Sequence, residues 1–282
     1  MPFVRVAVTT SVDVKVLSLA KALFSKSQLE VIATGIEQNG LLNVVDGWSM
    51  LHICSYLSDT LTLPNPAFSH PLLKDMLIED GIVDPVEQRT IDLMELCQLL
   101  VKNPDQIDGK DPYGRRPIDL TTYAPLVDLL MANGASLSGT EPISSPLHVS
   151  ATLPYKDPTI HLAKGADPSH LDSKNRPALS LVLFNDYLDE VKIGSLVEAS
   201  KAVLNTKDVF GNFPQSYAVL TQSSQTVAHI AHFSSLETVQ YVVEQLTHSS
   251  IIVPDDFITP NNGIPYLIFD SIWARSQKKE RN

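Results

Sequence analysis

A short motif recurs along this chain, and its spacing constrains the fold more than any other feature. Each copy holds a turn, a proline-started short helix, a second apolar helix and a glycine stop, and the two clearest copies begin at Asp111 and Ser145. Proline suits the first helical turn, where its missing N–H would have no partner, and glycine suits the position just past a helix end. The prolines Pro117 and Pro146 lie 29 residues apart. Recurrence at this spacing is typical of a stacked repeat protein.

The second copy carries the most specific pattern in the chain. It reads Ser145-Pro146-Leu147-His148-Val149-Ser150. This stretch resembles the ankyrin repeat, a unit of about 33 residues with a β-turn and two helices and the signature T-P-L-H-x-A. Residues 49–54 and 226–231 match the signature less closely, and the turn element recurs at 111–117 and 208–214. On these five matches the chain is identified as a divergent member of the ankyrin repeat family.

The resemblance implies an all-α fold. It predicts an ankyrin-repeat α-solenoid in which helix pairs stack and β-turn or hairpin fingers project beside the first helices, with about seven degenerate units. We expect residues 1–45 to form an N-terminal arm and a capping helix pair, and residues 46–270 to form the repeat array. The array has insertions near 58–90 and 185–194, and residues 271–282 are a polar C-terminal tail.

Apolar periodicity and capping residues predict the individual helices. They fall at about 14–24, 28–38, 72–79, 85–102, 178–184, 195–204, 215–220 and 236–246. Two interpretations of the second unit stay open. Its first helix, which contains Leu51, pairs either with 72–79 or with 85–102, and in the second case 58–85 is one large insertion. The unit that begins at Asp208 has either an insertion or three helices.

Composition narrows the compartment and the kind of partner. The chain has 282 residues, 44% apolar and 19% charged, which is enough to bury a core. Its net charge of −11 argues against a broad phosphate-binding face, so we expect no nucleic acid and a protein partner with a basic or neutral surface. Two cysteines, no signal peptide and no apolar run of about 18 residues predict a soluble, cytoplasmic protein without membrane insertion.

No catalytic constellation is visible, and we assign no catalytic residue, cofactor, small-molecule substrate or metal. Cys54 and Cys97 lie in apolar helical patterns and are interpreted as packing residues. His229 and His232, three apart on one helix, are a possible ligand pair without an evident third ligand. In ankyrin repeats the signature histidine is implied to be structural, which predicts that His52 and His148 are buried and bonded to backbone.

Turn tips are the candidate binding residues. In the family the turns and first helices form a concave face that binds proteins, and Trp, Tyr and Arg are enriched at binding hot spots. The residues at these positions are Trp48, Tyr113, Arg115, Arg116, Arg176, Phe210, Asn212 and Phe213. Alternatively, Trp48 and Phe213 pack on the adjoining finger. A secondary acidic patch contains Asp75, Glu79, Asp80, Asp84 and Glu87, which form either a solvated helix face or a docking patch.

The resulting hypothesis is a non-enzymatic protein-interaction module. We expect it to be a dedicated subunit, adaptor or assembly factor of a larger complex, because its unit lengths have diverged widely. The alternative is a regulatory domain or an enzyme with a site grafted onto an insertion. A perturbed histidine or cysteine in a closed pocket would favour that alternative.

Overall fold

A computed structural model describes residues 11–24, 26–61, 85–139, 145–153, 156–184 and 188–253. These residues form α-helices, short 3₁₀ helices and turns, and within them the only β-type pairings are the isolated bridges Val45–Trp48 and Leu171–Pro177. The described part of the chain is therefore all-α. The described residues divide into two compact units, with the boundary between Ala135 and Ser136.

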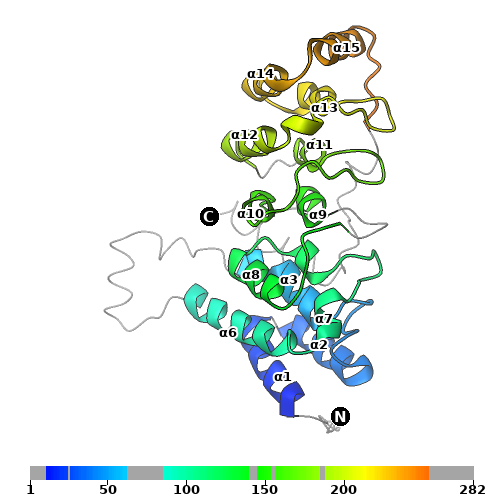
Figure 1. Cartoon of the computed structure of the whole chain (residues 1–282). Helices are drawn as coiled ribbons and strands as arrows, with labels where there is room; N and C mark the ends of the chain where they lie inside the picture. The colour runs from blue at the N-terminus through cyan, green and yellow to red at the C-terminus, as the bar shows by residue number, and fades with distance from the viewer. Residues whose placement is uncertain are drawn as a thin grey trace, which may run out of the picture. The chain divides into compact units, whose positions relative to one another are not determined.

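The first unit contains seven described helices. They are α1 (Ser11–Leu23), α2 (Lys26–Asn39), α3 (Met50–Leu61), α6 (Pro85–Leu100), α7 (Pro104–Asp108), the 3₁₀ helix η1 (Pro117–Leu120) and α8 (Ala124–Ala132). Helix α3 is central: it packs against α6, α7 and η1, while α6 also contacts α1 and α8 (Figure 1). Helix α3 is buried on all sides from Met50 to Ser58, and α6 buries one face that includes Leu93 and Leu96.

The packing of α3 against α6 favours one of the two interpretations of the second unit. Helix α6 is the partner of the Leu51 helix, as the interpretation with one long insertion requires. The other interpretation paired the Leu51 helix with residues 72–79, which lie outside the described residues. Helix α6 begins at Pro85 in the first-turn position that the sequence predicts, and it ends close to the predicted Lys102.

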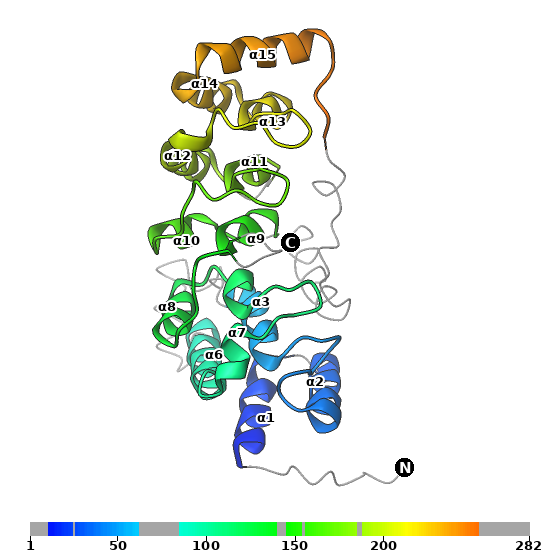
Figure 2. The same cartoon turned by 45° about the vertical axis from the view of Figure 1, so that its right-hand side comes forward.

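In the second unit the helices form two rows. The first row holds α9 (Pro146–Thr152), α11 (Ala178–Val182), α13 (Pro214–Thr221) and α15 (Leu236–Thr247), and the second row holds α10 (Thr159–Ala163), α12 (Glu190–Ala199) and α14 (Ser224–Phe233). Each first-row helix packs on the next one in its row, and the second row does the same (Figure 2). Successive antiparallel pairs thus share one continuous core.

Two sequence expectations fail in this unit. The helix predicted from Ser195 begins at Glu190, because Asp189 caps it by accepting a hydrogen bond from the Lys192 N–H. Residues 190–194 are therefore helical and do not belong to the predicted insertion. Residues 226–231 lie in α14, a second-row helix, so they do not occupy the first-helix position of the signature that they matched. Three helices, α13, α14 and α15, follow the turn at Asp208, and α15 stands in the first row after the pair α13–α14.

None of the helices in the described part of the chain is both long and apolar enough to cross a lipid bilayer. The predicted boundaries at 45/46 and 270/271 stay predictions.

Candidate protein-binding surface

Three turns share one local architecture, in which an aspartate organises the backbone. In the turn 172–176, Asp172 Oδ1 accepts hydrogen bonds from the N–H groups of Lys174 (2.9 Å) and Arg176 (2.8 Å). Its own N–H donates to the Arg176 carbonyl (2.9 Å), which closes the turn. Asn175 takes the left-handed conformation with φ 63°, which asparagine tolerates better than most residues.

The other two turns repeat this arrangement. Asp111 Oδ1 accepts from the N–H groups two and four residues later, and Asp208 Oδ1 does the same. Glycine fills the left-handed position in both, as Gly114 (φ 76°) and Gly211 (φ 82°). The aspartate is thus used internally in every copy, and its carboxylate does not contribute a surface charge at the turn.

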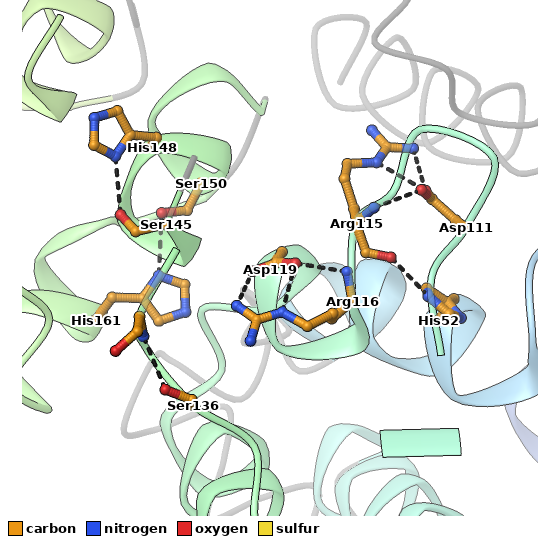
Figure 3. A network of polar contacts seen from close by, with 11 residues as sticks. His52, Asp111, Arg115, Arg116, Asp119, Ser136, Ser145, His148, Ser150 and His161 are labelled. Carbon is orange, nitrogen blue, oxygen red and sulfur yellow. Dashed lines mark hydrogen bonds and ion pairs between the residues drawn. The ribbon is translucent and has the colours of Figure 1, made fainter. Parts of the chain in front are cut away.

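Two histidines tie a helix to the following turn. His52 Nδ1 lies 2.7 Å from Ser49 Oγ. Its Nε2 lies 3.0 Å from the carbonyl oxygen of Arg115 (Figure 3). In the second unit His148 makes the equivalent contacts, to Ser145 Oγ (2.9 Å) and to the Arg176 carbonyl (3.0 Å). Both rings are 1% exposed. The structural role predicted for these two histidines is confirmed.

Burial also shifts the titration of both rings. It lowers the pKa of His52 below 6.5 and that of His148 to about 4, because the charged imidazolium loses its hydration. A neutral ring suits the geometry, since one nitrogen can accept while Nε2–H donates to the carbonyl. His229 differs: it is half exposed on α14, and its Nε2 lies 3.1 Å from Glu198 Oε1. It does not share the role of the other two.

The three arginines predicted to reach outward are buried. Arg115 Nε donates to Asp111 Oδ2 at 2.8 Å, and Arg176 makes the same bond to Asp172. Arg116 donates to both carboxylate oxygens of Asp119, from Nε at 3.2 Å and from Nη2 at 3.0 Å (Figure 3). Exposure of these residues is only 3–6%. The outward placement was wrong, because each guanidinium pairs with a carboxylate within its own turn.

Three other candidates are buried as well. Trp48 is 1% exposed and lies against Arg115, whose guanidinium carbon is 5.4 Å from the indole centroid. Phe213 is 7% exposed and packs edge-on against Tyr241. Asn212 is 1% exposed and donates to the Ile252 carbonyl at 2.7 Å. For Trp48 the packing against an adjoining turn is the alternative that the sequence left open.

The surface of the turns is formed by other residues. Tyr113 is 58% exposed and Phe210 is half-buried, so these two of the eight candidates remain accessible. Val209, which is 63% exposed, also lies at this surface together with Lys174 and Lys207, and none of the three was predicted from the sequence. Lys207 and Val209 flank Asp208, and Lys174 lies between Asp172 and Asn175, the residue in the left-handed conformation. That position in the recurring turn is the signal that could have identified them.

In the second unit the two turns are bonded to each other. The Val209 N–H donates to the Lys174 carbonyl (3.1 Å), and Asn175 Nδ2 donates to the Lys207 carbonyl (2.5 Å). The Lys174 ammonium lies 5.8 Å from the Phe210 ring centroid. Figure 2 shows both turns on the side of the first row. We call residues Lys174, Asn175, Lys207, Val209 and Phe210 the finger surface.

The predicted acidic patch lies largely in residues that the structure does not describe. Asp75, Glu79, Asp80 and Asp84 lie outside the described residues, and the Glu87 side chain is also not described. Cys54 and Cys97 are buried free thiols, and the hydrogen bond between them, together with burial, raises the pKa of Cys54. In the part of the chain that the structure describes, no three His, Cys, Asp or Glu side chains are grouped so that they could hold a metal ion.

Comparison of the sequence with known proteins assigns the chain to no family. No protein-family model matches the sequence, and no curated protein matches it either.

Proposed function

We propose that this chain is an ankyrin-type repeat protein that binds another protein through its turns and first-row helices. Three observations support the family part of the proposal. They are the aspartate-organised turn in three copies, the histidine that bonds the following turn in two copies, and the paired rows of helices in the second unit. Solenoids of this kind present one extended surface formed by successive units.

The finger surface carries the functional part of the proposal. The aspartate carboxylates of its two turns are buried and accept hydrogen bonds within the turns. Hydrogen bonds between the neighbouring turns hold its backbone, and it presents Val209 and Phe210 beside two lysines. A pre-organised surface loses little conformational entropy when a partner binds. The two lysines make this surface locally basic although the net charge of the chain is −11. We therefore expect the partner segment at the fingers to be apolar with acidic or neutral neighbours.

The structural contacts of His52, His148, Cys54 and Cys97 give the enzyme alternative no support. His52 and His148 have both ring nitrogens engaged in structural contacts, and the two thiols lie in the core of the first unit.

Val209→Asp tests the finger surface. The tagged full-length chain and this variant are used for affinity purification from the native source, and the co-purifying proteins are quantified by mass spectrometry. We expect at least a tenfold loss of the specific partner with unchanged circular dichroism. The matched control is Val191→Asp, which places the same change at an exposed valine (79%) of α12. Equal loss in both variants, or in neither, would remove the finger surface from the proposal.

A further inference from the structure

Helix α15 presents apolar side chains to solvent. Leu236, Val243 and Leu246 are 72%, 55% and 45% exposed, and Val239 between them is half-buried. Steps of three and four residues place these four side chains on one face of the helix. We call them the α15 stripe. A contiguous apolar face of this kind on a folded protein marks an interaction site more often than an isolated exposed leucine does.

The opposite face of α15 fixes the helix in this orientation. Gln245 is buried, its Oε1 accepts from Ser216 Oγ at 2.6 Å, and its Nε2 donates to Asn212 Oδ1 at 3.1 Å. Thr238 and Val242 are buried on the same side, where α15 packs on α13. Rotation of the helix to bury the stripe would leave this amide unpaired in the core, which is unfavourable. The stripe therefore stays outward.

The charges along the stripe are acidic. Glu237 and Glu244, seven residues apart, lie on one side of it, and both are exposed. Helix α15 contains no lysine or arginine. Lys207 reaches the helix only at the Tyr241 ring, 3.6 Å from its centroid, and Tyr241 is on the side of the helix away from the stripe.

We propose that the α15 stripe docks an amphipathic helix of a partner protein, one with a matching apolar face and basic residues along its edge. A helix that lays its apolar face against another is a common mode of recognition, and complementary charges at the edge set its orientation. A second copy of this chain fits less well, because it would bring its own Glu237 and Glu244 to an edge that is already acidic. This surface is distinct from the finger surface, so the two are tested separately.

The probe is a pair of labelled 18-residue helical peptides with identical leucine positions, one with lysine and one with glutamate at the polar positions. Fluorescence anisotropy with the full-length chain should show binding of the Leu/Lys peptide and at least tenfold weaker binding of the Leu/Glu peptide. Val243→Asn should weaken binding of the Leu/Lys peptide at least tenfold. The combined Glu237→Gln and Glu244→Gln variant should weaken it severalfold and reduce its dependence on salt. Circular dichroism checks that each variant is folded.

Two controls isolate the stripe. Val191→Asn makes the same change at an exposed valine of α12, and Val209→Asp changes the finger surface; both should bind the Leu/Lys peptide like the unaltered chain. If Val243→Asn bound as tightly as Val191→Asn, the peptide would be attracted only by the negative charge of the chain, and the proposal would be wrong.

Two other results would assign the face to a different occupant and overturn the proposal. Self-association of the full-length chain in sedimentation velocity, abolished by Val243→Asn, would identify a second copy. Binding of the Leu/Lys peptide only by a chain that ends at Val253 would show that the C-terminal residues of the chain itself cover the stripe.

Discussion

His148 links three parts of the second unit through a single neutral ring. It contacts Ser145 at the start of its own helix, the Arg176 carbonyl in the next turn and the His170 ring, whose centroid is 5.6 Å away. A ring nitrogen that donates to a buried carbonyl satisfies a group that would otherwise be costly to leave without a partner. The same role for His52 in the first unit explains why histidine recurs at this position.

The buried ring makes stability depend on pH. Its pKa is about 4 in the folded protein and about 6.5 when unfolded, so the unfolded chain binds more protons between these values and is favoured as the pH falls. The contribution of the neutral His148 ring to the free energy of unfolding is fully present above pH 6.5. About 3 kcal/mol of this contribution is lost by pH 4. His148→Gln should remove that part of the pH dependence in urea unfolding. His248→Gln, at an exposed histidine, should leave it unchanged, and equal curves for all three proteins would contradict the account.

The buried ion pairs predict stability effects at the arginines. Arg116→Met leaves Asp119 buried without its partner, and burial already raises the pKa of that carboxyl group. Breaking a buried pair in this way costs about 3–5 kcal/mol. Lys110→Met, at an exposed position, should change the free energy of unfolding by less than about 0.5 kcal/mol. If the Arg116→Met variant were as stable as the unaltered chain but failed to bind the partner, Arg116 would be a binding residue and the structural role given to it here would be wrong.

One glycine determines how closely helix α2 and the following turn approach each other. Gly35 lies in α2, and a Cβ added there would be 1.7 Å from the Val44 carbonyl oxygen. The turn that carries Val44 is fixed by mutual bonds between Val45 and Trp48. Glycine is thus required by the contact, although alanine would be the better helix former.

Gly35→Ala should therefore destabilise the first unit by at least about 2 kcal/mol, because backbone must move to admit the methyl group. The matched control is Gly40→Ala. At Gly40 φ is +73°, but no atom lies within 4 Å of the new Cβ. We therefore expect this variant to lose only about 1 kcal/mol of unfolding free energy, from backbone strain. Thermal and urea unfolding of both variants measure the difference. A Gly35→Ala variant as stable as the unaltered chain would show that the close approach is absent.

Local signals in the sequence predicted many of the elements. Proline at a first helical turn located α6, α9 and α13, and the Asn39-Gly40 stop located the end of α2. Pairing could not be predicted in the same way, because α3 and α6 are separated by a long stretch and apolar periodicity does not say which helices face each other. The signature match at 226–231 was misleading since T-x-x-H also occurs in an ordinary amphipathic helix.

The candidate site was harder to predict than the fold. Residue type suggested arginine and tryptophan anchors, but an aspartate four residues before Arg115 and Arg176, or three after Arg116, captures each guanidinium inside the turn. This intraturn pairing could have been inferred from the spacing. The exposure of Val209 and of the α15 stripe could not, since it depends on which face of each element the rest of the chain covers.

At the scale of the whole molecule, net charge is a poor guide to partners. The chain carries a net charge of −11, yet the finger surface presents two lysines, whereas two glutamates lie along one side of the α15 stripe. Each surface attracts partners according to its own charges, because interactions between solvent-exposed charges are screened over about 8 Å at physiological salt. One partner with an acidic segment and a basic helix, or two partners, would satisfy both surfaces.

Hydrogen–deuterium exchange of the full-length chain, with and without the protein that co-purifies with it, shows directly whether a partner covers the finger surface. We expect slower exchange on binding in peptides that cover 171–176 and 207–213, the turns of the finger surface, and little change in the second-row helices α12 and α14. Unchanged exchange at both turns, with protection confined to α12 and α14, would contradict this expectation.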